Sequence, residues 1–230
     1  MTSPRSVKPL PPPYPRNVPL LKGALVSISD HPDTTTTVPF QFNPESLRRS
    51  VKPFTVGQGP GDRSSAVRFS GAATETISLT AQIDAFDGLD AGDSDTETNG
   101  ILPELAALQL LAYPSTADVT LYESQLKAGT VNVVPPLAPH LIFVWGQQRV
   151  LPVRLESMAI TEELFNGNLT PISASVALDL RVLTYSDAYP GNLEYKLFYS
   201  HQQAMEKLAS SVPTSSAKDI IGIDPDTLDS

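Results

Sequence analysis

The sequence predicts a mainly β protein built on an antiparallel sheet, and two segments of alternating residues carry this prediction. Residues 76–85 (TISLTAQIDA) and 172–182 (ISASVALDLRV) place an apolar side chain at nearly every second position, with mostly polar side chains between. Alternation over about ten residues is typical of a long strand with one buried and one solvated face, and such strands belong to antiparallel sheets. We therefore expect six or more strands, together with one internal helix and one C-terminal helix.

Shorter strands are predicted around these two segments. They span residues 23–29, 37–42, 140–145 and 149–160. The residues between the last two strands, Gly146–Gln148, predict a hairpin turn. Pro152 predicts an edge position or a bulge for the strand that contains it, because proline donates no hydrogen bond to a neighbouring strand. The connections at residues 43–68 and 86–99 are polar and are expected to be long loops, the second of them acidic.

Two segments change to helical spacing. Residues 101–112 follow Asn99, which can cap a helix, carry Pro103 in the first turn and stop before Pro114. Residues 193–209 repeat this spacing near the end of the chain. The apolar positions of the two helices are Ile101, Leu105, Leu108 and Ala112 in the first, and Leu197, Phe198, Ala204, Met205 and Leu208 in the second.

The chain divides into four predicted parts. Residues 1–21 hold seven of the 22 prolines and are expected to form an extended, basic arm or a disordered terminus. Residues 22–190 form the β domain, with the internal helix at about 101–112. Residues 191–210 form the C-terminal helix, and residues 211–230 an acidic flexible tail.

Composition narrows the function classes. Sixteen basic against 25 acidic residues argue against a nucleic-acid partner, since phosphate binding needs clustered Lys and Arg. No apolar run predicts a membrane span or a secretory signal, so we expect no direct membrane binding and a cytoplasmic protein. The absence of cysteine excludes thiol catalysis and thiolate metal sites, and fits a reducing compartment.

No motif predicts catalysis, a metal or a cofactor. His31, His140 and His201 have no second histidine at ligand spacing, and residues 57–61 (GQGPG) lack the Lys-Ser/Thr of a phosphate loop. Glu162 and Glu163 could do acid–base work only inside a pocket. We therefore expect no enzyme.

An acidic run imitates a calcium loop. Asp93, Asp95 and Glu97 have the required spacing to Glu104, but Thr98 stands where such a loop needs glycine. A solvated loop is the preferred interpretation of this segment.

Three stretches, taken together and in order, resemble a known family. They are residues 39–47 (PFQFNPESL), residues 143–146 (FVWG) with 149–156 (RVLPVRLE), and residues 160–165 (ITEELF) with 168–171 (NLTP) and 180–183 (LRVL). Residues 69–71, 76–79 and 102–105 fall between them in the expected order. The family is that of the tube-type proteins of contractile injection systems, phage-tail-like particles that drive a spiked inner tube through a membrane. The resemblance spans roughly residues 22–205.

The resemblance implies a tail-tube fold, a β-sandwich or half-barrel with a packed helix, whose copies assemble into a hexameric ring. The chain looks most like the baseplate hub adaptor, so its expected partners are further copies, the spike, inner-tube proteins and other baseplate components. The particle would be released or membrane-docked. Many family members carry a C-terminal LysM module, whereas after Gly191 this chain shows only a helix and an acidic tail. An inner-tube initiator or another tube layer therefore stays open.

Contacts between subunits or rings are expected at a small set of residues. The long loop at residues 43–68 can supply them, and deleting residues 55–64 should abolish ring stacking while the monomer stays folded. Core packing of Phe42, an ordinary turn at Asn43-Pro44 and an interior position of Trp145 are the alternatives. The polar face of residues 76–84 would suit a wet channel wall. The expected contact residues are Phe42, Asn43, Pro44, Glu45, Trp145, Glu162 and Phe165.

Two other function classes stay open. A stand-alone β-sandwich binding module for a carbohydrate or peptide would be a monomer with an aromatic groove, although the sequence holds a single tryptophan. A hydrolase with scattered carboxylates would show a pocket with converging acids.

Overall fold

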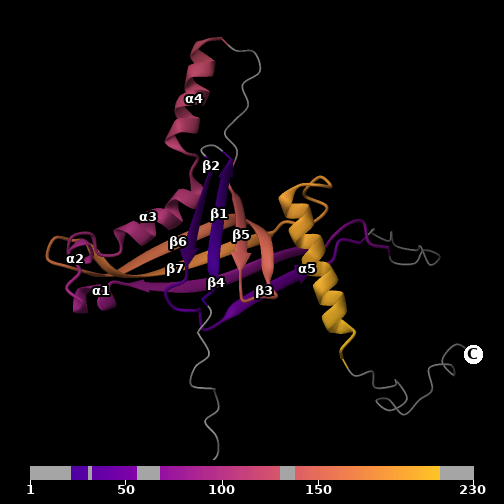
Figure 1. Ribbon diagram of the computed structural model, residues 1–230, viewed down its shortest axis with the longest axis horizontal. Coiled ribbons are helices and arrows are strands. Elements are labelled where there is room, and N and C mark those ends of the chain that lie inside the picture. Colours follow the sequence, from indigo (N-terminus) through magenta and orange to yellow (C-terminus); the bar gives the residue numbers. More distant parts are fainter. Residues whose placement is uncertain (1–21, 31–32, 56–67, 130–137, 213–230) are drawn as a thin grey trace, which may run out of the picture.

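The computed structural model of the protein describes residues 22–30, 33–55, 68–129 and 138–212. Its strands form one antiparallel sheet in the order β2-β1-β5-β6-β7-β4-β3, and the sheet stays open, with β2 and β3 at its edges (Figure 1). The predicted mainly β antiparallel fold is thereby confirmed. The strands are β1 (Ala24–Asp30), β2 (Asp33–Pro39), β3 (Leu47–Lys52), β4 (Thr74–Asp84), β5 (His140–Val144), β6 (Val150–Phe165) and β7 (Pro171–Val182).

The two long alternating segments became the paired strands β4 and β7. Ile77 lies opposite Leu180, and Leu79 opposite Leu178, all four with buried side chains. Burying each large side chain contributes about 1.5–3 kcal/mol, and a one-residue slip would turn the whole set toward water. The hydrophobic pattern therefore sets the register of this pair.

The sheet folds back over its own apolar side. In Figure 1, β1, β2 and β5 cross in front of β6, β7 and β4, which gives the sandwich-like, half-barrel layering expected of the fold. The space between the layers holds one hydrophobic core. Its members include Leu25, Phe40, Ile77, Leu108, Phe143, Leu151, Leu180 and Phe198.

The described part of the chain holds more helix than the sequence predicted. The expected helices occur as α3 (Leu102–Gln109), continued by the short η1 (Leu110–Ala112), and as α5 (Leu193–Ala209). The acidic connection at residues 86–99 was predicted to be a loop, and this is wrong: it forms α1 (Phe86–Asp90) and α2 (Ser94–Asn99). A further helix, α4 (Thr116–Lys127), had no sequence prediction. α1, α2 and α4 have no fully buried residue, whereas α3 and α5 do, so the run of buried apolar positions that predicts a helix is missing from the first three.

Three further expectations need correction. The connection at residues 43–68 contains the edge strand β3, and the second short strand ends at Pro39, not at residue 42. Pro152 is neither at an edge nor at a bulge, since β6 pairs with both β5 and β7 and its register shifts lie elsewhere. The carbonyl of Pro152 accepts the Leu183 N–H at 2.9 Å, just beyond the end of β7, so the missing proline N–H breaks no bond within β7.

Helices close the two ends of the layered sheet. Gly100, at the joint between α2 and α3, has φ +56°, and a Cβ there would lie 2.1 Å from the Pro171 carbonyl oxygen. The same carbonyl accepts the Ile101 N–H at 3.0 Å, so only glycine lets α3 begin this close to β7. α5 packs against β6 at the other end. No helix among the described residues has the length and apolar character needed to cross a bilayer.

The predicted arm at residues 1–21, the glycine-rich run at 57–61 and nearly all of the predicted tail at 211–230 lie outside the described residues.

Candidate assembly surfaces

The first group of expected contact residues lies in the turn after β2. The Asn43 Oδ1 accepts the Gly23 N–H at 2.9 Å and so ties this turn to the start of β1. The side chain of Phe42 is 48% exposed, which excludes core packing, and Glu45 is exposed as well. Pro44 is half-buried. The turn therefore offers an aromatic ring and a carboxylate at the surface, and its contact role stays a prediction.

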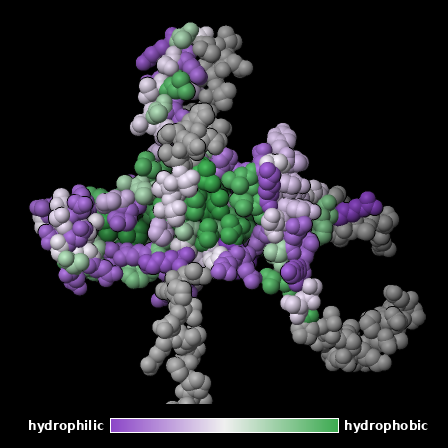
Figure 2. Space-filling model, in the orientation of Figure 1, coloured by the Kyte–Doolittle hydropathy of each residue, from purple (hydrophilic) through white to green (hydrophobic). Residues whose placement is uncertain are grey.

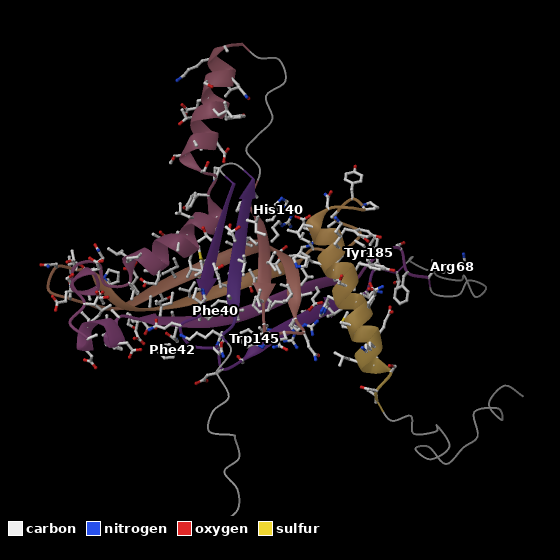
Figure 3. All side chains as sticks on the ribbon, viewed as in Figure 1. Phe40, Phe42, Arg68, His140, Trp145 and Tyr185 are labelled. Atoms are coloured by element: carbon white, nitrogen blue, oxygen red, sulfur yellow. The ribbon has the colours of Figure 1, made fainter. Side chains whose placement is uncertain are left out.

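Trp145 belongs to an aromatic cluster at the rim of the core. Its ring stacks on Phe143 with centroids 5.9 Å apart and lies 6.4 Å from the ring of Phe40 (Figure 3). The residue is half-buried, and its backbone N–H donates to the Arg149 carbonyl at 2.8 Å in the predicted hairpin. Because one face of its ring stacks on Phe143, Trp145 packs at the edge of the hydrophobic core. The aromatic groove of a sugar-binding module is not formed here.

The second group lies at the other end of β6. Glu162 and Phe165 are exposed near the turn at residues 166–170, whereas Trp145 adjoins the start of the strand. Sixteen residues of strand span about 50 Å. The structure therefore does not bring the seven expected contact residues together. It places Trp145 and the residues Glu162 and Phe165 at opposite ends of β6, whereas the turn that holds Phe42 is tied through Gln41 to Asp84, in the part of β4 that pairs with Ser173.

A polar surface covers the outer side of β3, β4, β7 and the second half of β6. On this side Ser78 lies opposite Asp179, and Gln82 opposite Ser175, and all of these side chains are half-buried or exposed. We call it the polar sheet face. Its polar residues are Arg48, Ser50 and Lys52 of β3, Thr76, Ser78, Thr80, Gln82 and Asp84 of β4, Arg154, Ser157 and Thr161 of β6, and Ser173, Ser175, Asp179 and Arg181 of β7, and the register adds three apolar residues, Ala159, Leu164 and Ala177.

Asp179 joins three strands of the polar sheet face. Its carboxylate accepts the Ser78 hydroxyl at 2.6 Å and the Ser157 hydroxyl at 2.7 Å. These two hydrogen bonds, that from Ser78 first, hold the pKa of Asp179 below its ordinary value of 3.8. Asp179 and Ser157 were not among the expected site residues. Their alternation with apolar neighbours was visible, but their meeting across β6 and β7 depends on the strand order.

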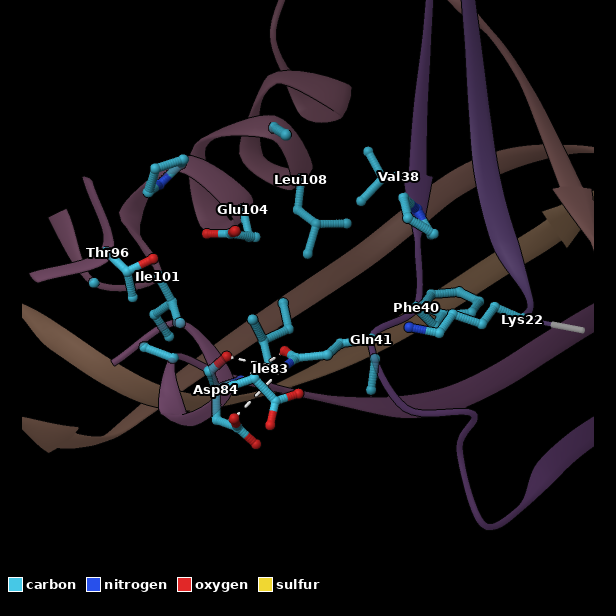
Figure 4. Close-up of a pocket in the computed structure, with 18 of the residues that line it drawn as sticks. Lys22, Val38, Phe40, Gln41, Ile83, Asp84, Thr96, Ile101, Glu104 and Leu108 are labelled. Carbon is cyan, nitrogen blue, oxygen red and sulfur yellow. Dashed lines mark hydrogen bonds between the residues drawn. The ribbon is translucent and has the colours of Figure 1, made fainter. Parts of the chain in front are cut away.

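A pocket of about 550 Å³ opens between β2, the end of β4 and α3 (Figure 4). Val38, Ile83 and Leu108 form apolar walls. The amide of Gln41 closes one side, because its Nε2 donates to the Asp84 carbonyl at 2.9 Å and its Oε1 accepts the Asp84 N–H at 2.8 Å. These two hydrogen bonds pair the Gln41 amide with the backbone of Asp84 as a neighbouring strand would. Gln41 therefore has a structural role.

Two carboxylates in or near this pocket serve local structure, while Asp87 and Glu104 also line it. Asp84 accepts the Phe86 N–H at 3.1 Å, and Asp93 caps α2 by accepting the Thr96 N–H at 3.0 Å. The segment that imitates a calcium loop is therefore a capped helix. Within the four described ranges, no three His, Asp or Glu side chains are grouped to hold a metal ion.

Comparison with known proteins places the chain in a family. Two of the solved structures that match illustrate the low similarity. The tail of an empty GTA particle, with C6 symmetry, is 14% identical over 70% of this chain and 90% of its own, with TM-score 0.31. The virion of a native gene transfer agent particle is 13% identical over the same shares, with TM-score 0.28. Scores this low support no structural argument.

A comparison with curated proteins found no match. The family model of the contractile injection system tube protein matches residues 20–188, so the chain belongs to the contractile injection system tube proteins.

Proposed function

We propose that this tube-family protein is a structural, non-catalytic ring at the baseplate hub, where six copies join the spike to the inner tube. Family membership supports a structural place in a tail-like particle. The number six and the hub position follow the resemblance of its motifs to hub adaptors. In this proposal the ring assembles in the cytoplasm into a particle that is later released or membrane-docked.

The polar sheet face is the observation that carries the proposal. A conduit wall must stay hydrated, and this face presents hydroxyl, amide and charged side chains over four strands. Hydroxyls of Ser78 and Ser157 are held in place by Asp179, which makes the surface both wet and ordered. The opposite side of β4 and β7 is the core. A ring with this face inward therefore keeps these two strands in their preferred surroundings.

The open sheet also provides unlike surfaces for a head-to-tail ring. One edge strand, β3, carries Arg48, Arg49 and Lys52, whereas the other, β2, is a run of threonines. Each edge leaves backbone groups unpaired on one side. A closed ring needs such a heterologous contact, in which one surface of a copy meets a different surface of the next.

Two measurements test the proposed ring: the mass of the assembly, and whether the polar sheet face points into the channel. Light scattering of the chain co-purified with spike and inner-tube proteins should give six times the 24.7 kDa chain mass within the complex. Because the chain has no cysteine, Thr80→Cys places one thiol on the polar sheet face. In the particle this thiol should react with a small maleimide but not with a large polyethylene-glycol maleimide.

The control is Glu206→Cys on the exposed side of α5, and both thiols should react with both reagents in the free chain. A chain that stays monomeric beside its partners, or a Thr80→Cys thiol that reacts equally with both reagents in the particle, contradicts the proposal. If the inner-tube protein binds this chain and the spike does not, the ring belongs to another layer of the tube and not to the hub.

A further inference from the structure

The outer side of the sheet changes character at β1 and β5. Val26 lies opposite Ile142 and Ala24 opposite Val144, and these side chains are half-buried. The inner neighbours Leu25 and Phe143 are fully buried. These strands are thus apolar on both sides, which is typical of strands covered on both faces. We call the outer surface the β1–β5 face. Its apolar residues are Ala24, Val26, Ile28, Ile142, Val144 and Val150, and His140 and the buried Pro152 lie on the same side.

Within the described chain, α5 covers only the border of the β1–β5 face, where its Glu194 contacts His140, the residue opposite Ile28. Figure 2 shows this face as a hydrophobic patch over β1 and β5, turned toward the viewer between α4 and α5. The polar sheet face continues the same outer surface across β6, beginning at Arg154. The outer surface of the sheet therefore has two parts: the polar sheet face, which is suited to water, and the apolar β1–β5 face, which is suited to a partner.

A helix with an apolar stripe on one side is present in the same chain. α4 buries no residue and stands away from the sheet (Figure 1). Val119, Tyr122 and Leu126 follow one another at helical spacing and form a stripe, with Val119 38% and Leu126 51% exposed. Isolated helices of 12 residues are marginal in water, so α4 gains most of its stability only when this stripe is packed.

The helix and the β1–β5 face match in size and in charge. Twelve helical residues extend about 18 Å and the seven residues of β1 about 23 Å. Asp118 and Glu123 flank the apolar stripe of α4, and Lys127 forms an exposed ion pair with Glu123, so Asp118 is the acid that stays available for a partner. Lys22 and Arg149 flank one end of the β1–β5 face, beside Ala24 and Val150. Apolar contact at the centre and opposite charges at the rim are what a helix docked on this face requires.

We propose that α4 of one copy packs on the β1–β5 face of a second copy. The partner is a copy of the same chain because the chain carries both complementary surfaces while its own α4 points away from its own sheet. The contact joins two different surfaces and is therefore heterologous, as a ring or a stack of rings needs. This inference rests on the proposed assembly and names a contact that holds it together.

Cross-linking of cysteine variants tests the contact, since the natural chain has no cysteine. Val26→Cys marks the centre of the β1–β5 face and Tyr122→Cys the centre of the α4 stripe. The two single variants are mixed, assembled with spike and inner-tube proteins, and treated with a short bismaleimide, because packed elements lie further apart than a disulfide spans. A covalent dimer should form in this mixture. It should be absent when Thr80→Cys on the polar sheet face replaces Val26→Cys.

Substitution on α4 gives a second test that does not depend on cysteine chemistry. Val119→Glu should abolish the cross-link and the assembly, whereas Thr120→Glu on another side of the helix should keep both. Both side chains are exposed, so the monomer should unfold as the natural chain does. The proposed α4 contact is wrong if rings of full mass form without the cross-link, or if the Val119→Glu variant still forms them. In either case the proposed ring itself is retained. Cross-linked dimers that never close into a ring reject the ring and keep the contact. A Val26→Cys/Tyr122→Cys double variant that links only within one chain also overturns the contact.

Discussion

Gly23 marks the place where the aromatic cluster meets the turn after β2. A Cβ on Gly23 would lie 2.6 Å from Trp145 Cε3 and 2.9 Å from Phe40 Cδ2. Gly23→Ala must therefore displace both rings, and overpacking of this kind costs about 1–3 kcal/mol. Urea unfolding should show a loss of this size. Gly167→Ala is the control, because a Cβ there meets no atom within 4 Å, and an equal loss in both variants would contradict the explanation.

His201 couples the docking of α5 to pH. Its side chain is buried, and this desolvation, with a smaller effect of Arg49, lowers the pKa of His201 from 6.5. Below that value the unfolded chain binds a proton that the folded chain resists, so the free energy of unfolding decreases as pH falls. His201→Leu should flatten this decrease between about pH 7 and about pH 5 in urea titrations. Identical pH slopes for the variant and the natural chain would show that another group is responsible.

At the scale of elements, α4 is a helix secured by its cap and not by the core. The Ser115 hydroxyl accepts the Asp118 N–H at 3.0 Å. Ser115→Ala removes about 1 kcal/mol from the helix. Because α4 buries nothing, hydrogen exchange should accelerate only across residues 116–127, while the global unfolding midpoint stays unchanged. Thr120→Ala is the mid-helix control and should not accelerate exchange. A lowered global midpoint in Ser115→Ala would show that α4 is part of the core.

At the scale of the whole molecule, the segment between β3 and β4 can be shortened without touching the core. Thr55 pairs with Phe69, and the Ser70 N–H donates to the Phe54 carbonyl at 2.9 Å, so the two ends of the segment are held together. Deleting residues 56–64 should leave the unfolding midpoint of the monomer unchanged and stop assembly at single rings, as seen by electron microscopy. Replacing the segment by Gly and Ser of equal length separates its length from its chemistry. Full-length stacks from the deletion variant would contradict a stacking role.

Much of the fold was predictable because the deciding forces are local. The alternation of β4 and β7 and the helical spacing of α3 and α5 record which side of each element meets the core, and the structure has these elements where expected. α1, α2 and α4 escaped prediction because none of them has a fully buried residue, and the short apolar stripe of α4 is too weak a hydrophobic period to predict a helix. Of the expected contact residues, Phe42 and Phe165 are exposed, but the 16-residue strand β6 separates Trp145 from Glu162 and Phe165.

The amino-acid sequence by itself determined the strand class, the two core-packed helices and the family, since each depends on residue types at short spacing. The tertiary structure alone decided that Ser78, Asp179 and Ser157 meet on three neighbouring strands, and that apolar and polar outer surfaces join across β6. Strand order and the folding of the sheet over itself arise from burying side chains far apart in the chain. A local pattern shows which residues seek burial, but not which distant residues will cover them.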